Sequence, residues 1–369
     1  MAVLETTLSP VGPYSLALSA RHANDRTRSF RDGLLSCAFR AGGGPALARA
    51  WQQRDGALRV RLESEAPEAA LDTLRFVLAV DDDHAEFLRR FRSDRLLGPA
   101  TTRLRGLRPL RTATVTHALV RALCGQLISA REARRIEARL IARYAGAHGG
   151  LSLPPTREDF AGESPAALCA YGLVARKSAA LVRISRALDL ERLRAIPTAA
   201  AVRRLVEERT LGPWSAGVLC LEGLGRYEHG LVGDLGLVKL CRRLLGREAT
   251  AEDTAELLAP YGEWAGLASV YLLAGGTPAH GRDDSAIRSE RRRGRVAPAS
   301  SRGSASREPP ALDARAADTA ATTNGRPGAG LLHAVDRGVD VGGLGTAGAR
   351  SGASSAGSGR SRARQGSRT

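Results

Sequence analysis

Apolar and polar residues alternate near the N-terminus of this chain, whereas apolar residues recur at helical spacing further along it. Residues 57–64, ALRVRLES, alternate strictly and predict a strand. Residues 33–44, GLLSCAFRAGGG, predict a second strand that ends in a glycine turn, and residues 66–80 predict a helix. We therefore expect a small mixed α/β domain over residues 1–85.

Residues 86–278 follow a helical pattern. The apolar positions of residues 115–146 predict two helices, and Ser129 with Glu132 forms an S-x-x-E capping box where the second begins. Ser164 before Pro165 predicts another helix start, and Thr198 is expected to cap a helix over residues 198–209. About eight short helices with tight connections predict a compact all-α domain.

The composition changes after Thr277. Residues 279–369 are rich in Gly, Ala, Ser and Arg and contain almost no apolar clusters. Such a segment buries too little apolar surface to offset the entropy lost on ordering, so we expect a disordered tail. The tail is either a nonspecific DNA-binding arm or functionally inert. The predicted fold class is α+β: a small α/β domain, an all-α domain and this tail.

The charge of the chain points to an anionic partner. The 369 residues carry a formal charge of +17, of which +8 falls on residues 279–369 and the remaining +9 on residues 1–278. Nucleic acid is the commonest partner of so basic a protein. A GC-rich genome explains why Arg outnumbers Lys, since only Lys177 and Lys239 are lysines, but it does not explain the excess of bases over acids.

The five cysteines, which are Cys37, Cys124, Cys169, Cys220 and Cys241, fit no zinc or iron–sulfur spacing. Most of them lie in apolar runs, so we expect buried free thiols in a reducing cytoplasm. No segment is long and apolar enough for a membrane span, and the N-terminus has no basic region typical of a signal peptide. We expect a cytoplasmic, nucleoid-associated protein.

Residues 203–224 predict a helix, a tight RTLG turn and a second helix with Pro213 at its first position. The unpaired N–H groups at such a helix start bind a phosphate without sequence preference. A positive φ at Gly212 would let the backbone approach the phosphate closely. A helix–turn–helix connection that never contacts DNA is the alternative.

Asp234 follows a predicted loop and precedes another helix, LGLVKLCRRLL. The simplest interpretation is an N-cap that accepts hydrogen bonds from the helix start. Because these bonds and the helix dipole favour the charged form, we expect the carboxylate to stay ionised. A charged carboxylate facing DNA is unfavourable unless it takes part in chemistry, so both roles are open.

These motifs together resemble the helix-hairpin-helix GPD superfamily of DNA glycosylases, and most closely its 3-methyladenine-DNA glycosylase II family. GLRPLRTATVTHALVRALCGQLIS resembles the entry into that family's catalytic domain, LGPWSAG its hairpin, and GDLGLVK the segment with its catalytic aspartate. The resemblance covers roughly residues 10–278 and includes the small N-terminal α/β domain.

The resemblance implies a role for each of several residues. Asp234 would stabilise the oxocarbenium charge of the sugar and orient the attacking water. Trp214 would line the pocket for the flipped base, and Leu127, next to Gln126, would be pushed into the gap in the duplex. The hairpin residues Thr210, Leu211 and Gly212 would hold a backbone phosphate, with a monovalent cation as a possible ligand of their carbonyls. Alternatively, Trp214 and Leu127 are ordinary core residues.

Three positions depart from the family pattern. Thr210 stands where the first hairpin glycine is usual, and if that position needs a positive φ the strain costs about 1–3 kcal/mol. Val218 and Leu273 stand where the family's base pocket often has further aromatic residues. These departures weaken the predictions of phosphate affinity and of lesion preference.

The resemblance predicts a monofunctional enzyme. Bifunctional relatives carry a catalytic lysine where this chain has Trp214, and no cysteine follows Cys241 to form the iron–sulfur loop of other relatives. We expect a monomer that removes alkylated purines from double-stranded DNA without a metal or cofactor. The alternatives are an inactive DNA-binding protein, a glycosylase for deaminated or oxidised bases, and a helical interaction protein.

Overall fold

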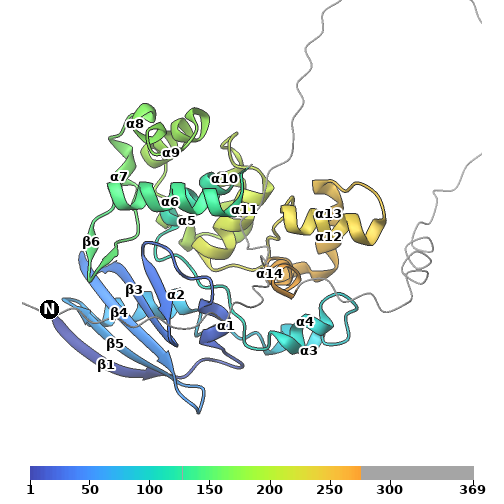
Figure 1. Cartoon of the computed structure of the whole chain (residues 1–369), viewed down its shortest axis with the longest axis horizontal. Helices are drawn as coiled ribbons and strands as arrows, with labels where there is room; N and C mark the ends of the chain where they lie inside the picture. The colour runs from blue at the N-terminus through green and yellow to red at the C-terminus, as the bar shows by residue number, and fades with distance from the viewer. Residues whose placement is uncertain (127, 276–369) are drawn as a thin grey trace, which may run out of the picture. The chain divides into compact units, whose positions relative to one another are not determined.

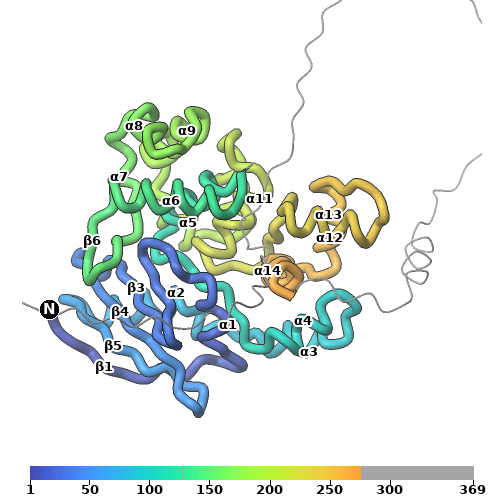
Figure 2. The backbone as a smooth tube through the Cα atoms, in the orientation of Figure 1, coloured from blue at the N-terminus to red at the C-terminus, as the bar shows by residue number. Residues whose placement is uncertain are grey.

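The computed structural model describes residues 1–126 and 128–275. A five-stranded sheet is followed by a succession of helices, so the mixed α+β class predicted from the sequence is confirmed (Figures 1 and 2). The predicted tail over residues 279–369 lies outside the described residues, and so does Leu127. Within the described ranges, no helix has both the length and the apolar character that crossing a bilayer requires.

The sheet has the order β1-β5-β4-β3-β2, and each neighbouring pair is antiparallel. Leu58, Val60 and Leu62 form the buried face of one strand, and the residues between them face outward, as the alternating sequence predicts. The strands are β1 (Ala2–Leu8), β2 (Arg28–Arg31), β3 (Leu34–Ala41), β4 (Gly44–Gln52) and β5 (Leu58–Ser64). Helices α1 (Leu16–Ala20) and α2 (Pro67–Leu78) contribute Leu16, Leu74 and Leu78 to the same core.

The helical part begins after the sheet and its covering helix. It contains α3 (Ala85–Arg90), α4 (Gly98–Arg103), α5 (Val115–Gly125), α6 (Ala130–Tyr144), α7 (Glu158–Ala161), α8 (Pro165–Cys169), α9 (Ala175–Ala187), α10 (Thr198–Val206), α11 (Pro213–Val218), α12 (Leu235–Leu245), α13 (Ala251–Leu258) and α14 (Ala265–Gly275). A π-helix (Leu219–Leu224) continues α11, 3₁₀ turns cover Leu190–Ala195 and Ala259–Trp264, and a small hairpin joins β6 (Ala147–His148) to β7 (Leu151–Ser152).

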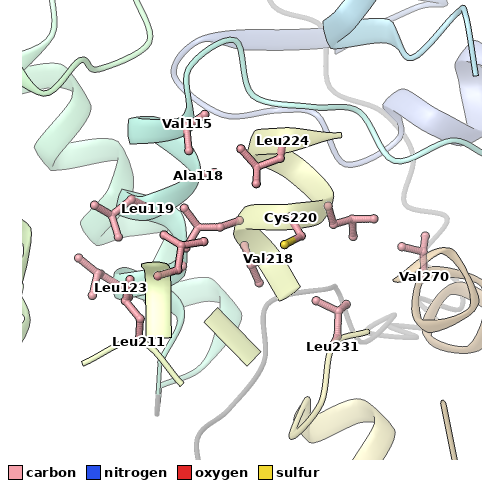
Figure 3. Packing of buried hydrophobic residues seen from close by; sticks show 14 of the residues in the cluster. Val115, Ala118, Leu119, Leu123, Leu211, Val218, Cys220, Leu224, Leu231 and Val270 are labelled. Carbon is pink, nitrogen blue, oxygen red and sulfur yellow. The ribbon is translucent and has the colours of Figure 1, made fainter. Parts of the chain in front are cut away.

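Helix α5 is the centre of the helical part, since every one of its residues is buried. Its Leu119 and Leu123 belong to the same hydrophobic cluster as Leu211, Val218 and residues of the π-helix, as Figure 3 shows. A second cluster lies under the sheet. It consists of buried apolar residues between Leu8 and Val80 together with Leu110. The domain boundary at residue 85 stays a prediction, although it falls between the two clusters.

The predicted helix starts are partly confirmed. The hydroxyls of Ser129 and Ser164 accept hydrogen bonds from the amides of Glu132 and Ala167, so both are N-caps as expected. The reciprocal bond from the Ser129 amide to the Glu132 side chain, which would complete the predicted capping box, is not formed among the described residues. The prediction for Thr198 is wrong: Pro197 occupies the N-cap position and Thr198 is already helical. The Thr198 hydroxyl donates instead to Glu228. The five cysteines are free thiols; Cys169 is half-buried and the others are buried.

Candidate functional site

The hairpin between α10 and α11 has a different backbone from the one predicted. Gly212 has φ −87° and ψ −177°, which is extended rather than left-handed. Thr210 also lacks a positive φ. Among the described residues, the non-glycine residues with a positive φ are Asp32 and Ala79. The condition under which Thr210 would be strained is therefore not met. The turn is closed by the Leu211 amide, which donates to the carbonyl of Glu208 at 2.7 Å.

The Leu211 side chain is 3% exposed and packs in the core (Figure 3), so it holds the hairpin on α5 and does not reach outward as a DNA contact would. Val218 is likewise 2% exposed and belongs to the same cluster, which corrects its assignment to the base pocket. Both positions follow from helical packing: an apolar residue that faces α5 is covered by it.

Gln126 ends α5 and connects it to the hairpin. Its amide nitrogen donates to the carbonyl of Thr210 at 2.8 Å and to the hydroxyl of Ser215 at 2.9 Å. Its own carbonyl accepts a hydrogen bond from Lys177 of α9 at 2.5 Å. Gln126 thus fixes the hairpin relative to α5, a function that the sequence did not suggest. Its predicted contact with DNA remains a prediction.

Asp234 and Trp214 are in contact although they belong to different helices. Trp214 lies on α11, the helix that follows the hairpin, and Asp234 lies at the start of α12. Asp234 is the N-cap of α12, and its Oδ1 accepts from the amide of Gly236 at 2.8 Å. Its Oδ2 accepts from the indole nitrogen of Trp214 at 3.1 Å. The carboxylate is 1% exposed, and Trp214 is half-buried. The N-cap interpretation of Asp234 is therefore confirmed, and a second partner holds the carboxylate in a defined orientation. Its role in chemistry stays a prediction.

The pKa of Asp234 is raised to about 6. Burial is the largest cause, and the hydrogen bonds from Gly236 and Trp214 oppose it only in part. Desolvation thus outweighs the helix-start bonds that were expected to favour the charged form. The group is still mainly ionised at neutral pH, and a raised pKa at a buried carboxyl is a common property of functional acids and bases.

The loop before Asp234 packs closely against two helices, and a glycine on each helix allows this close approach. A Cβ on Gly217 of α11 would lie 2.6 Å from the carbonyl oxygen of Gly230, and one on Gly266 of α14 would lie 2.9 Å from that of Tyr227. The amides of Leu231 and Gly233 also donate to hydroxyls of α14 and α13. Sequence reasoning missed Gly217 and Gly266; a glycine inside a helical pattern is the signal that marks such close approaches.

A cavity lies between the sheet half and the helices. Its apolar walls come from both halves, and Leu18 of α1 and Leu273 of α14 are among them. The Leu273 side chain would lie 2.4 Å from a Cβ placed on Gly236, which is the residue that binds Asp234. Leu273 therefore contacts both this cavity and the segment of Asp234, but Asp234 and Trp214 do not line the cavity, so the assignment of Leu273 to a base pocket stays a prediction. No Phe, Tyr or Trp is among the described residues that line it.

A buried ion network forms the floor of this cavity. Arg121 of α5 pairs with Asp25, with Glu137 of α6 and with Glu222 of the π-helix. Asp25 also binds Arg28. Burial acts to raise the pKa of Asp25, but the two guanidiniums outweigh it and hold this pKa well below its usual range. The network therefore joins the sheet half to three helical segments through charges that neutralise one another. In the described part of the chain, no three His, Cys, Asp or Glu side chains are grouped closely enough to hold a metal ion.

Known proteins resemble this chain in sequence and in fold. No family model matches the sequence. A DNA-3-methyladenine glycosylase of Bacillus subtilis is 24% identical over 204 residues, which cover 52% of this chain and 67% of that protein. A 3-methyladenine DNA glycosylase from Archaeoglobus fulgidus superposes with a TM-score of 0.65 at 22% identity, over 72% of this chain and 96% of that one.

A second fold neighbour has a different named substrate. The 8-oxoguanine glycosylase/lyase of Clostridium acetobutylicum superposes with a TM-score of 0.60 at 15% identity, over 75% of this chain and 99% of that one. At these identities the superpositions establish the fold and leave the substrate open.

Proposed function

We propose that this chain, which belongs to the helix-hairpin-helix superfamily of DNA glycosylases, is a monofunctional enzyme that releases alkylated purines from duplex DNA. The reaction is hydrolysis of the N-glycosidic bond of a base flipped out of the helix. The 3-methyladenine class is favoured by the sequence relative, which carries that substrate in its name.

The observation that carries the proposal is the hydrogen bond between the buried Asp234 and the half-buried Trp214. When the base leaves, positive charge develops on the sugar, and a preoriented carboxylate in a water-poor site stabilises that charge more strongly than water does. Asp234 has the required charge at neutral pH, a fixed orientation through its two hydrogen bonds, and a desolvated position. A carboxylate that only capped a helix needs neither burial nor a second donor.

DNA as the partner is supported by charge and by fold. Residues 1–278 carry an excess of nine positive charges, and two of the fold neighbours were solved with DNA bound. In this proposal the hairpin residues Thr210 to Gly212 bind a phosphate through the backbone, and Leu127 fills the gap left by the flipped base. Gln126 keeps the hairpin in place for both.

The monofunctional assignment follows from the position of the two lysines. The ammonium group of Lys177 donates a hydrogen bond to the backbone carbonyl of Gln126, and Lys239 is exposed on α12. The site that would need an amine for a Schiff base contains Trp214 instead. Water is therefore the proposed nucleophile.

The test is release of free bases from alkylated duplex DNA, resolved by chromatography. We expect 3-methyladenine and 7-methylguanine in the supernatant with the unmodified chain. Release of oxidised or deaminated bases alone would assign a different lesion, and binding without any release would leave a non-catalytic DNA-binding protein.

A further inference from the structure

A groove rich in arginine extends from the cavity along the boundary between the sheet and α6. The cavity described above and a neighbouring depression share Asp25, Arg28, Arg134 and Glu137 in their linings, so they form one continuous surface. Seven arginines and three carboxylates line the two together, which is a formal excess of four positive charges. We call this surface the arginine groove. Its seven arginines are Arg21, Arg26, Arg28, Arg31, Arg108, Arg121 and Arg134.

The carboxylates of the groove already form ion pairs with arginines inside the protein. Asp25, Glu137 and Glu222 are bound to Arg121 and Arg28 at its floor. The remaining Arg108 is fully buried and donates to backbone carbonyls. The excess charge therefore belongs to the four arginines at the rim.

The rim arginines, Arg21, Arg26, Arg31 and Arg134, have no ion-pair partner among residues 1–126 and 128–275. Arg26, Arg31 and Arg134 are exposed and Arg21 is half-buried. The pKa of His22, which lies among them, is lowered by burial and further by the charges of Arg21 and Arg134. A surface with several cations and no counter-charge attracts a chain of anions.

The proposed function identifies the anion. A DNA strand is a regular array of phosphates, and the rim arginines are exposed or half-buried cations without a counter-charge among the described residues. Leu273 lines the inner end of the groove and also lies beside Gly236, whose amide donates to Asp234, although Asp234 and Trp214 do not themselves line the groove.

Resting on the proposed glycosylase function, we propose that the arginine groove binds the backbone of the DNA strand that carries the target base. The sheet half of the chain then contributes phosphate contacts of its own, in addition to those of the hairpin.

The experiment compares two double variants of the full chain. Arg26→Ala with Arg31→Ala removes two rim charges whose side chains make no hydrogen bond or ion pair among the described residues, so the fold is expected to persist. Arg54→Ala with Arg89→Ala removes the same charge from exposed positions that line neither the cavity nor its neighbour. Thermal unfolding of both variants establishes that the fold is retained.

The measurement is the dissociation constant for a duplex with a stable abasic-site analogue, at several salt concentrations. Each phosphate contact contributes about 0.9 to the slope of log K against log salt, so the rim variant should lose about 1 to 2 in slope and roughly tenfold in affinity at low salt. The control variant should bind as the unmodified chain does. Equal losses of affinity in both variants would assign the effect to net charge. No loss of affinity in either variant would show that the groove does not bind DNA. Both results overturn the proposal.

The outcome is separable from the proposed function. Base release by the unmodified chain together with unchanged DNA binding by the rim variant refutes the groove alone. Weaker DNA binding by the rim variant, with no base released from any damaged duplex by the unmodified chain, refutes the glycosylase function and leaves the groove in place.

Discussion

The indole nitrogen of Trp214 donates a hydrogen bond to Oδ2 of Asp234 at 3.1 Å, although twenty positions separate the two residues in the sequence. The bond connects the helix that follows the hairpin to the start of α12. A movement of the hairpin on binding a phosphate would therefore reach the carboxylate through one side chain. The same bond favours the ionised form of a group whose burial favours the neutral form.

Replacing the carboxylate should separate activity from stability. In Asp234→Asn, base release should fall by at least about 100-fold, because the charge that stabilises the sugar cation is gone. The pKa of Asp234 is raised from 3.8 to about 6 on folding, so its ionised form costs about 3 kcal/mol of folding stability at pH 7. Asparagine is also a good N-cap, but its NH2 group cannot accept one of the two hydrogen bonds that the carboxylate accepts from Gly236 and Trp214, which offsets about 1–3 kcal/mol of the gain. The variant should therefore unfold at a slightly higher temperature than the unmodified chain at pH 7.

The sign of this effect depends on pH. A group whose pKa is raised on folding contributes full stability below its unfolded pKa of 3.8 and loses it as the pH rises through about 6. The advantage of Asp234→Asn should therefore shrink as the pH is lowered from 7 towards 4, which thermal unfolding at several pH values measures. An unstable variant at pH 7 with ordinary DNA affinity would show that capping is the main role of Asp234.

Two substitutions of Trp214 distinguish its ring from its N–H group. Trp214→Phe keeps an aromatic face but removes the donor, so the pKa of Asp234 should rise further and the acid limb of the rate profile should move to higher pH. Trp214→Ala removes both and should also slow release at the pH optimum. Single-turnover rates between pH 5 and 8 test this, and an identical acid limb, near pH 6, in Trp214→Phe and the unmodified chain would contradict it.

Arg121 should be the most sensitive position for stability in the region between the two halves. Arg121→Met leaves Asp25, Glu137 and Glu222 without their shared cation in a buried site, which costs about 3–5 kcal/mol. Arg131→Met is the matched control, since Arg131 is exposed on α6. Urea unfolding of both variants measures the difference, and equal stabilities would mean that water reaches the network freely.

The elements with strong periodicity were predictable from the sequence. The alternation in residues 57–64 and the helical spacing in residues 115–146 each reflect one face that is buried and one that is not, and β5, α5 and α6 appear where these patterns predict them. The Trp214 and Asp234 positions could be selected as a pair because their spacing matches a known family. Their hydrogen bond could not be predicted, since it depends on how two helices are placed in space.

The errors at the hairpin and at Val218 have a common physical cause. Pattern alone assigns a residue to a motif but does not say which face of a short helix is covered by a neighbour. Leu211 and Val218 are covered by the central cluster around α5, and Gly212 has room for its extended backbone without a left-handed turn. The ion network around Arg121 was missed for the same reason, because its members come from four separate segments.

A covalent intermediate should not form. With Trp214 at the position of the amine and Lys177 bound to the Gln126 carbonyl, borohydride should trap no adduct between the protein and DNA that contains a damaged base. Denaturing electrophoresis of the reduced mixture measures this. A trapped adduct that disappears in Lys177→Gln or Lys239→Gln would identify the nucleophile and refute the monofunctional assignment.

The lesion preference should follow the chemistry of the leaving base more than the shape of the pocket. A purine methylated at N3 or N7 carries a positive charge, and the glycosidic bond is weakened because the base departs as a neutral molecule. Trp214 is the one aromatic residue predicted to line the base pocket, and Leu273 is apolar, so the pocket offers a single stacking surface and little selective binding beyond it.

The indole face of Trp214 would add about 0.5–2 kcal/mol for a cationic ring. We therefore expect 3-methyladenine and 7-methylguanine to be released much faster than hypoxanthine or 8-oxoguanine. Trp214→Ala should slow the cationic bases by about tenfold or more, which corresponds to about 1.4 kcal/mol. Parallel single-turnover assays on matched duplexes measure these rates. Faster release of a neutral lesion would overturn the substrate assignment, and the role of Asp234 would stand, because the sugar cation forms whichever base departs.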